Sequence, residues 1–319
     1  MARLLALCTI VILGALAITV RAAQQPPGDP IAAMLAQKPS LQALSIEKLR
    51  DNLFVMRGAG GNIAAFVTAN GVVMVDSGLP GWGQSILTKL KTVTDKPVTT
   101  LINTHAHFDH ASGNVEFPAN VDIVTHANAK QYMENVHQVY GLAASPSNNI
   151  YKEHGGRGLP KRTFTRTLTI GSGNDRVELR YYGRAHTGGD AFVIFPALRI
   201  AHVGDVFPNK GLPIMDKNNG GAGVAYPATV AAAAAGLAAM NVETLINGHM
   251  PTQTTIADMK QYADFTRAFV TAAGDAKKAG KTVAQFAAEW KVPAGFPGYS
   301  LGLGDTAKND AQVVWEEIK

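Results

Sequence analysis

Short apolar runs alternate with glycine-rich turns in the first part of the chain. The runs cover residues 53–57, 63–68 and 72–75. Gly58-Ala59-Gly60-Gly61 and Asn70-Gly71 separate them, and Asn-Gly is a strong signal for a tight hairpin. The pattern therefore predicts an antiparallel meander, with the main body of the protein starting near Asp51.

Strand-like and helix-like patterns alternate further along the chain. Buried-strand patterns cover residues 98–103, 121–125, 163–170, 177–182, 191–195, 199–202 and 244–246. Helical spacing predicts helices over residues 82–93, 127–140, 229–240, 256–279, 283–290 and 310–318. Residues 145–161 and 207–226 lack periodicity, so we expect two long loops that shape a binding site. This order of elements predicts two layers of mixed sheet covered by helices.

The N-terminus has the pattern of a secretory signal peptide. Arg3 precedes seventeen residues without a charge, and small and polar residues follow from Arg21 onward. We expect cleavage after Ala22, with the bond after Ala23 as the alternative. A retained membrane anchor or a lipid anchor on Cys8 is disfavoured, so the mature protein is expected to be periplasmic without a stable membrane anchor. The expected organisation is a signal peptide (1–22), an N-terminal extension (23–50), a main domain (51–255) and a C-terminal helical extension (256–319).

Composition excludes several classes of protein. With 46% hydrophobic and 17% charged residues, 32 glycines and 16 prolines, the chain is neither disordered nor a coiled coil. Cys8 is the only cysteine, so a processed chain has no disulfide, thiolate nucleophile or cysteine metal ligand. The net charge of +5 includes Arg3 and Arg21. The remaining positive charge is small and spread along the chain, which is not typical of a nucleic-acid-binding surface. We expect a small-molecule substrate and no nucleic-acid partner.

Four residues with side chains that can bind metal lie together in His105-Ala106-His107-Phe108-Asp109-His110, directly after the predicted strand 98–103. Residues two apart in extended backbone point to the same side, so His105 and His107 can converge on one ion. Asp109 and His110 in the following turn can face a second ion. Imidazole and carboxylate suit zinc and, less selectively, iron or manganese. A histidine-rich surface turn is the disfavoured alternative.

Three more candidate ligands stand among glycines at the ends of predicted strands. They are His186, Asp205 and His249. Groups at the ends of different strands meet in space, and glycine lets the backbone approach a buried site closely. The seven candidates together fit two ions that share one carboxylate. The remaining histidines are interpreted as locally bonded (His126, His202), helical (His137) or loop residues near the substrate (His154).

These motifs resemble those of the metallo-β-lactamase fold superfamily of hydrolases. The match comprises HAHFDH at 105–110, AHTGGD around His186, HVGDVF around Asp205, NGH ending at His249 and VVMVDSG around Asp76, in family order. The resemblance covers about residues 51–255. It implies an α/β fold of four layers, an αβ/βα sandwich of two mixed β-sheets flanked by helices, with the site along one sheet edge.

The resemblance also implies a role for each candidate residue in a site for two zinc ions. The first ion would be held by His105, His107 and His186, the second by Asp109, His110 and His249, with Asp205 bridging them. Asp76 would orient the ligand loop without touching metal. Iron and manganese remain alternatives to zinc.

Two divalent ions in such a site lower the pKa of a shared water, so hydroxide is the expected nucleophile near neutral pH. Asp109 would orient this nucleophile or accept its proton, and no serine, cysteine or lysine nucleophile is needed. The expected function is therefore an exported dinuclear zinc hydrolase that cleaves a small ester, lactone, thioester or amide-type substrate.

Fold alone does not decide which bond is cleaved. Some lactamases carry a cysteine ligand at the position of Asp205, so an aspartate there favours glyoxalase II-like or lactonase-like enzymes. Export, by contrast, favours a true β-lactamase acting on β-lactam antibiotics. A mono-iron dioxygenase is disfavoured because the second ligand set is complete. A non-catalytic metal-binding protein on the same fold predicts missing ligands, but all seven positions are filled.

Overall fold

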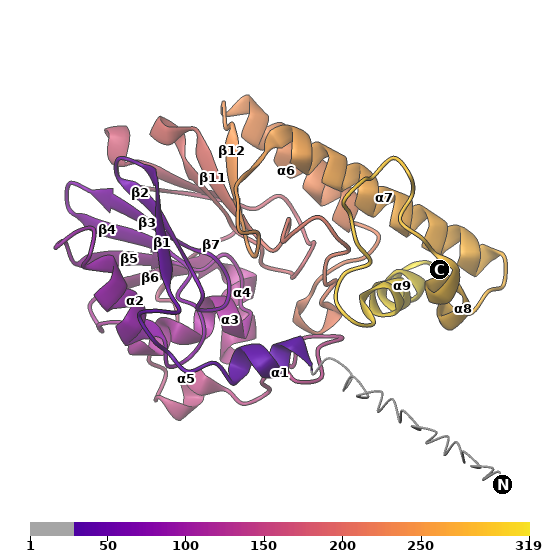
Figure 1. Cartoon of the computed structure of the whole chain (residues 1–319), viewed down its shortest axis with the longest axis horizontal. Helices are drawn as coiled ribbons and strands as arrows, with labels where there is room; N and C mark the ends of the chain where they lie inside the picture. Colours follow the sequence, from indigo (N-terminus) through magenta and orange to yellow (C-terminus); the bar gives the residue numbers. More distant parts are fainter. Residues whose placement is uncertain (1–28) are drawn as a thin grey trace, which may run out of the picture.

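The computed structural model describes residues 29–319 and contains two β-sheets that pack against each other (Figure 1). The first sheet has the strand order β1 (Ser45–Arg50), β2 (Leu53–Arg57), β3 (Ile63–Thr68), β4 (Gly71–Val75), β5 (Val98–Ile102), β6 (Asp122–His126) and β7 (Arg162–Phe164). Strands β1 to β4 pair antiparallel and β4 to β7 pair parallel. The predicted Asn-Gly turn joins β3 and β4, so the predicted meander is confirmed.

The second sheet is also mixed. Its strand order is β13 (Thr254–Thr255), β12 (Thr244–Asn247), β11 (Ile200–Gly204), β10 (Phe192–Phe195), β9 (Val177–Arg180) and β8 (Thr167–Ile170). Strands β8 to β11 pair antiparallel, whereas β11 and β12 are parallel. The carboxyl ends of β11 and β12 therefore lie at the same edge of this sheet.

Helices cover the outer faces of both sheets. On the side of the first sheet lie α1 (Pro30–Leu35), α2 (Gly83–Leu90), α3 (Phe108–Ala111), α4 (Ala127–Glu134) and α5 (Ile150–Glu153). On the side of the second sheet lie α6 (Tyr226–Ala239), α7 (Ile256–Lys278), α8 (Val283–Glu289) and α9 (Thr306–Glu317). Helices α6 and α7 run side by side, and α8 and α9 pack near the C-terminal end of α7 (Figure 1).

Alternate residues of the central strands enter different apolar layers. Leu53 and Val55 of β2 lie between the two sheets, whereas Phe54 and Met56 face the helices of the first sheet. Successive side chains of a strand point to opposite faces, and here both faces are covered, which explains the nearly continuous apolar runs. The four-layered αβ/βα sandwich of two mixed sheets flanked by helices is confirmed.

The prediction of one strand over residues 163–170 is wrong. Strand β7 ends the first sheet, β8 begins the second, and the chain bends between them at Thr165 and Arg166. The Thr165 carbonyl accepts a hydrogen bond from His126 Nε2 (2.9 Å), and the Arg166 carbonyl accepts one from Tyr181 N (3.0 Å). Periodicity cannot detect a change of sheet, because both halves have the same pattern.

The predicted helix 127–140 is too long. Helix α4 ends at Glu134, and Asn135 leaves the helical region with φ −129° and ψ 73°. The following residues turn toward the loop between β11 and α6, where Tyr140 N donates to Asp216 Oδ1 (2.9 Å). His137 consequently lies in a loop and not on a helix.

The first sheet begins at Ser45, within the segment expected to be an N-terminal extension and before Asp51. Strand β1 pairs with β2, but most of its side chains are exposed. Polar, charged edge strands are common because they prevent pairing between molecules, and they give little apolar signal.

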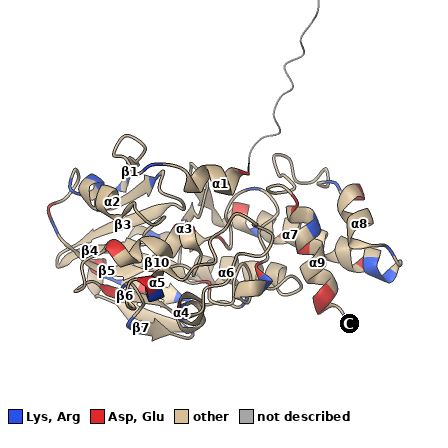
Figure 2. Cartoon of the chain, turned by 90° about the horizontal axis from the view of Figure 1, so that it is seen from below, with Lys and Arg blue, Asp and Glu red and all other residues tan. Residues whose placement is uncertain are grey.

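Within residues 29–319 no helix is long and apolar enough to cross a membrane. The predicted signal peptide and Cys8 lie outside the described residues. Acidic and basic residues are interspersed over the helices and loops of the described chain (Figure 2).

Candidate metal centre

The metal-binding cluster starts where β5 ends and α3 begins. His107 precedes the first residue of α3 with extended backbone (φ −65°, ψ 149°), and His105 stands two residues before it. Asp109 and His110 lie within the single turn of α3. All four side chains are buried. An extended segment followed by a helical turn thus presents all four to one interior space, as the sequence predicts.

The other three candidates reach the same space from the second sheet. His186 lies in the loop between β9 and β10, Asp205 directly after β11, and His249 after β12. A Cβ atom at Gly248 would overlap the Asp205 carboxylate, so glycine is required before His249 for this close approach. His186 and Asp205 are buried, whereas the His249 side chain is 33% exposed. The structure brings together all seven residues that the sequence singled out.

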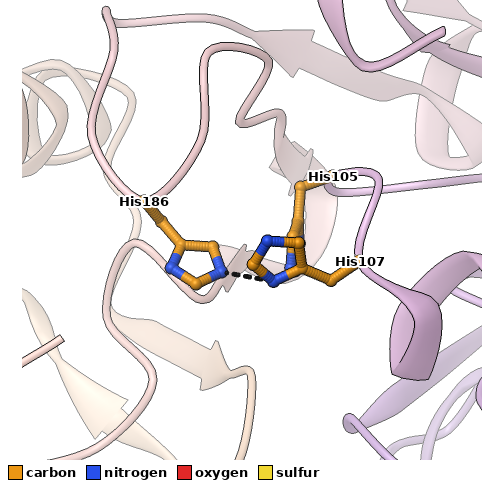
Figure 3. Close-up of side chains that lie close together, drawn as sticks. All are labelled: His105, His107 and His186. Atoms are coloured by element: carbon orange, nitrogen blue, oxygen red, sulfur yellow. Dashed lines mark hydrogen bonds between the residues drawn. The ribbon is translucent and has the colours of Figure 1, made fainter. Parts of the chain in front are cut away.

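Three imidazole rings form the first group, His105, His107 and His186 (Figure 3). His107 Nε2 donates to Asp216 Oδ2 (2.8 Å), and His186 Nδ1 donates to the Ile214 carbonyl (2.7 Å). Neutral imidazole carries one proton, so His107 Nδ1 and His186 Nε2 face each other at 3.0 Å with lone pairs only. Two facing lone pairs repel each other unless a cation lies between them.

The second group combines one carboxylate with two histidines: Asp109, His110 and His249. His110 Nδ1 donates to Asp76 Oδ2 (2.8 Å), so His110 Nε2 faces inward, 3.3 Å from His249 Nε2. Asp109 Oδ2 lies 3.4 Å from His249 Nε2. Asp205 lies between the two groups, with oxygens 3.4 Å from His110 Nε2 and 3.8 Å from His186 Nε2.

Asp76 orients His110 directly and His105 through Thr104. It follows β4 with φ 64°, a region that is uncommon for a residue other than glycine. Its carboxylate accepts hydrogen bonds from His110 Nδ1, from Thr104 N (2.7 Å) and from Thr104 Oγ1 (2.8 Å). Thr104 Oγ1 lies 2.9 Å from His105 Nδ1 and can accept its proton, so His105 Nε2 points inward unprotonated. The structure places Asp76 behind the histidines, as the resemblance implies.

Asp216 has the same role for His107 and was not predicted from the sequence. Asp216 is fully buried, and its carboxylate also accepts from Tyr140 N (2.9 Å) and Asn219 Nδ2 (2.6 Å). Its local sequence, Met-Asp-Lys-Asn-Asn-Gly, is typical of a turn, and Asp216 Oδ1 does accept from Asn218 N within that turn. No local signal distinguishes this aspartate from an ordinary turn residue.

Burial and neighbouring charges set the protonation of the candidate ligands. Burial lowers the pKa of His186 to about 4, and burial together with the neighbouring His110 lowers the pKa of His105 well below its usual value. Burial alone would raise the pKa of Asp205, but His249 and His110 outweigh it and hold that pKa well below its usual value. Near neutral pH His105 and His186 are therefore neutral and Asp205 is ionised, the forms that bind cations. Burial alone would lower the pKa of His110 and His249, but Asp205 and Asp109 outweigh it and raise both pKa values, so a bound ion would displace a proton from each of these two rings.

The C-terminal segment holds the loop that carries Ile214 and Asp216. Asp310 of α9 accepts a hydrogen bond from Met215 N (3.1 Å), between these two residues. Leu212 N donates to the Ser300 carbonyl (3.1 Å). The Ile214 carbonyl and the Asp216 carboxylate orient His186 and His107, respectively. Both are therefore held in place by residues that follow the second sheet in the sequence.

Replacing Asp216 by alanine should weaken metal binding about 10–100-fold, the usual cost of losing a carboxylate behind a ligating histidine. The Asp216→Asn variant keeps an acceptor for His107 Nε2 without the charge and should lose less. Competition with a chromophoric chelator measures both affinities. Wild-type affinity in Asp216→Ala would show that this carboxylate does not position His107.

The buried carboxyl group of Asp310 should make the free energy of unfolding depend on pH. Burial raises the pKa of its carboxyl group well above the usual value, so the folded chain keeps a proton that the unfolded chain loses. The stability contributed by such a group is present below its unfolded pKa, about 3.9, and is lost as pH rises through its folded pKa. The Asp310→Asn variant cannot ionise, so its free energy of unfolding relative to wild type should rise between about pH 4 and pH 8. Urea unfolding across this range tests the sign; a difference that is constant or falls with pH contradicts the prediction.

The other histidines do not join the cluster. His126 Nε2 donates to the Thr165 carbonyl (2.9 Å) and His202 Nε2 to the Asn62 carbonyl (3.0 Å), so both are locally bonded, as predicted. His154 is exposed, and its Nδ1 bonds to the Ile150 carbonyl (2.9 Å).

Comparison with known proteins agrees with the fold. The family model of the Metallo-beta-lactamase superfamily matches residues 56–249. The fold is similar to that of DIM-1 metallo-beta-lactamase, at 16% identity and TM-score 0.53 over 70% of this chain and 97% of that one. A metallo-beta-lactamase from Pontibacter korlensis matches at 18% identity and TM-score 0.55, over 70% of this chain and 99% of that one.

A third similar structure is the stereoselective inverting sec-alkylsulfatase Pisa1 from Pseudomonas sp. It matches at 14% identity and TM-score 0.65, over 90% of this chain and 54% of that one. At such identities the structures establish the fold, and the family model covers more than half of the chain. The chain therefore belongs to the metallo-beta-lactamase superfamily, whose members are metal-dependent hydrolases.

Proposed function

We propose that this protein is an exported dinuclear zinc hydrolase that cleaves a small ester, lactone, thioester or amide-type substrate. The observation that carries the proposal is the convergence of ring nitrogens and carboxylate oxygens on one interior space. One ion would be held by His105, His107 and His186, the other by Asp109, His110 and His249, and Asp205 would bridge them. The proposal of export rests on the N-terminal sequence pattern.

The donor atoms fit a divalent metal. His105 Nε2 and Asp205 Oδ1 are buried and have no hydrogen-bond partner among residues 29–319. A buried polar atom without a partner costs about 1–3 kcal/mol, and a coordinated cation removes this cost. A set of imidazole and carboxylate groups without sulfur suits zinc, with iron and manganese as alternatives.

Divalent ions in such a site polarise a substrate oxygen and lower the pKa of a bound water. Asp109 is the candidate catalytic residue. Its carboxylate lines the cavity beside the cluster, where it would orient the attacking water and accept its proton. Asp76 accepts a hydrogen bond from His110 and Asp216 accepts one from His107, so these two carboxylates fix the orientation of the two rings.

A true β-lactamase is the second candidate, supported by the likeness to DIM-1 and to the Pontibacter korlensis enzyme. One observation weighs against it. A β-lactam antibiotic carries a carboxylate that favours a cationic partner, but no lysine or arginine of the described chain lines the cavity. The likeness to a sec-alkylsulfatase adds sulfate esters to the substrates worth testing.

Metal quantification on the purified protein, followed by one hydrolysis panel, tests the proposal. The panel contains an acyl-homoserine lactone, a glutathione thioester, a chromogenic cephalosporin, a phosphodiester and a secondary alkyl sulfate. We expect about two zinc ions per chain and turnover of a carboxylic ester, lactone or thioester. A single bound iron, or fastest turnover of the phosphodiester or the sulfate ester, would contradict the proposal. Fastest turnover of the cephalosporin would select the second candidate.

A further inference from the structure

A cavity of about 260 Å³ opens against the metal cluster. His107, Asp109, His186, Asp205 and His249 form its polar end. The rest of the wall is largely apolar and includes Ile31, Met34, Phe108, Leu212, Ile214 and Leu303. A substrate held at the cluster must therefore place its remaining atoms against aliphatic and aromatic side chains.

The wall away from the metal cluster carries no charge among the described residues. Nearby lysines are occupied elsewhere: Lys210 pairs with Asp258 (3.1 Å) and Lys217 with Glu316 (2.7 Å). The polar side chains beyond the metal-binding groups are Asn209 and Thr306. An anionic group placed in this part of the cavity would lose water without gaining a counter-ion, which is costly.

Much of the apolar wall comes from the two ends of the described chain. Helix α1 contributes Ile31 and Met34, and the loop before α9 contributes Leu303, all outside the family match at 56–249. Asp29 caps α1 by accepting a hydrogen bond from Ile31 N (2.8 Å). Figures 1 and 2 both show α1 between the first-sheet side and the C-terminal helices.

One of the two predicted binding loops lines this cavity and the other does not. The loop 207–226 supplies Leu212 and Ile214, whereas none of residues 145–161 lines it. The contribution of the terminal segments was not predicted, because an isolated helical turn and a Gly-rich loop carry no sign of which cavity they will border.

We propose that this cavity binds an uncharged apolar group of the substrate, and that Met34 and Leu303 set the accepted chain length. The proposal rests on the proposed function, since the hydrolysed bond must lie at the metal cluster. A cavity of 150 Å³ holds benzene, so about 260 Å³ holds roughly ten non-hydrogen atoms. The substrate class is a carboxylic ester, lactone or thioester with a medium-length alkyl or aromatic group.

Two chain-length series test this inference. The first measures kcat/KM for γ-lactones with unbranched alkyl tails from methyl to decyl. Each added methylene that becomes buried should raise kcat/KM about fourfold, until the cavity is full at roughly ten non-hydrogen atoms. The second measures binding of alkylhydroxamates of increasing length by calorimetry, which reports on the cavity without hydrolysis. Binding should strengthen over the same range.

Leu303 offers a variant with a closely matched control. Its side chain is 51% exposed at the cavity wall, so Leu303→Asp is compatible with folding and places a charge beside the tail. This variant should flatten both chain-length series. Leu41 is similarly exposed (42%) but does not line the cavity, so Leu41→Asp should keep the wild-type slopes. Met34→Trp fills part of the cavity and should shift the optimum to shorter tails.

The outcomes separate this inference from the proposed function. Absence of metal, of hydrolysis and of acetohydroxamate binding would contradict the proposed function. Metal binding and hydrolysis with no dependence on chain length would overturn the inference alone. Equal slopes in Leu303→Asp and Leu41→Asp, or preference for a carboxylate-bearing or sulfate-bearing substrate, would overturn it as well.

Discussion

Replacing Asp205 by alanine should abolish hydrolysis and reduce bound metal from about two ions per chain to about one or fewer. Asp205 is the one candidate ligand whose carboxylate lies within 4 Å of ring nitrogens from both groups, His186 of the first and His110 and His249 of the second. Without its charge, two cations held side by side would repel each other with no shared anion to screen them. Metal quantification by mass spectrometry and the hydrolysis assay measure the two effects.

The matched control is Asp264→Ala. Asp264 is an exposed aspartate of α7 that pairs with Arg267 (2.5 Å) and does not line the cavity. The Asp264→Ala variant should keep wild-type metal content and activity. Circular dichroism on both variants separates loss of metal from loss of fold. A folded Asp205→Ala protein with full activity and unchanged metal content would refute the assignment of Asp205 as the bridging ligand.

Replacing Phe269 by alanine should lower the free energy of unfolding by about 3–5 kcal/mol. Phe269 of α7 is fully buried, with ring centroids 4.9 Å from Trp290 and 5.6 Å from Phe286. The deletion leaves a cavity where the C-terminal helices pack on each other. A domain of this kind has only about 5–15 kcal/mol of total stability, so a large shift of the urea midpoint is expected.

Arg267→Ala is the control for this prediction, because Arg267 lies on the same helix with 52% of its side chain exposed. Surface changes of this kind usually stay within about 0.5 kcal/mol. A loss below about 1 kcal/mol in Phe269→Ala would contradict the prediction. Two separate unfolding transitions in the wild type would show that the C-terminal helices unfold independently of the sheets.

Local sequence predicted most of the strands closely. Strands β2 and β3 have the expected bounds, because apolar runs that end at glycine turns are a strong local signal. Strand β1 was not predicted, because an exposed edge strand with charged side chains lacks that signal. The split between β7 and β8 was not predicted either, since the strand pattern does not say which sheet a strand joins.

In the candidate site, too, some residues could be predicted from local sequence and others could not. His105, His107, Asp109 and His110 could be predicted as a group because they are adjacent in sequence and follow a buried strand. Asp216 could not, because its link to His107 joins residues more than a hundred positions apart (2.8 Å). The apolar wall formed by α1 and Leu303 also depends on how distant segments fold back.

The four-layered αβ/βα order and the site at one sheet edge were implied by the resemblance of the motifs to a known family. The sequence by itself determined two layers of mixed sheet covered by helices and the seven residues that converge at strand ends. These depend on strand periodicity and on side-chain chemistry at strand ends, which are local properties of the chain. Only the tertiary structure decided which nitrogen of His107, His110 and His186 faces the centre. It also decided which terminal segments enclose the cavity. Protonation and cavity shape depend on partners far away in sequence, so no local pattern encodes them.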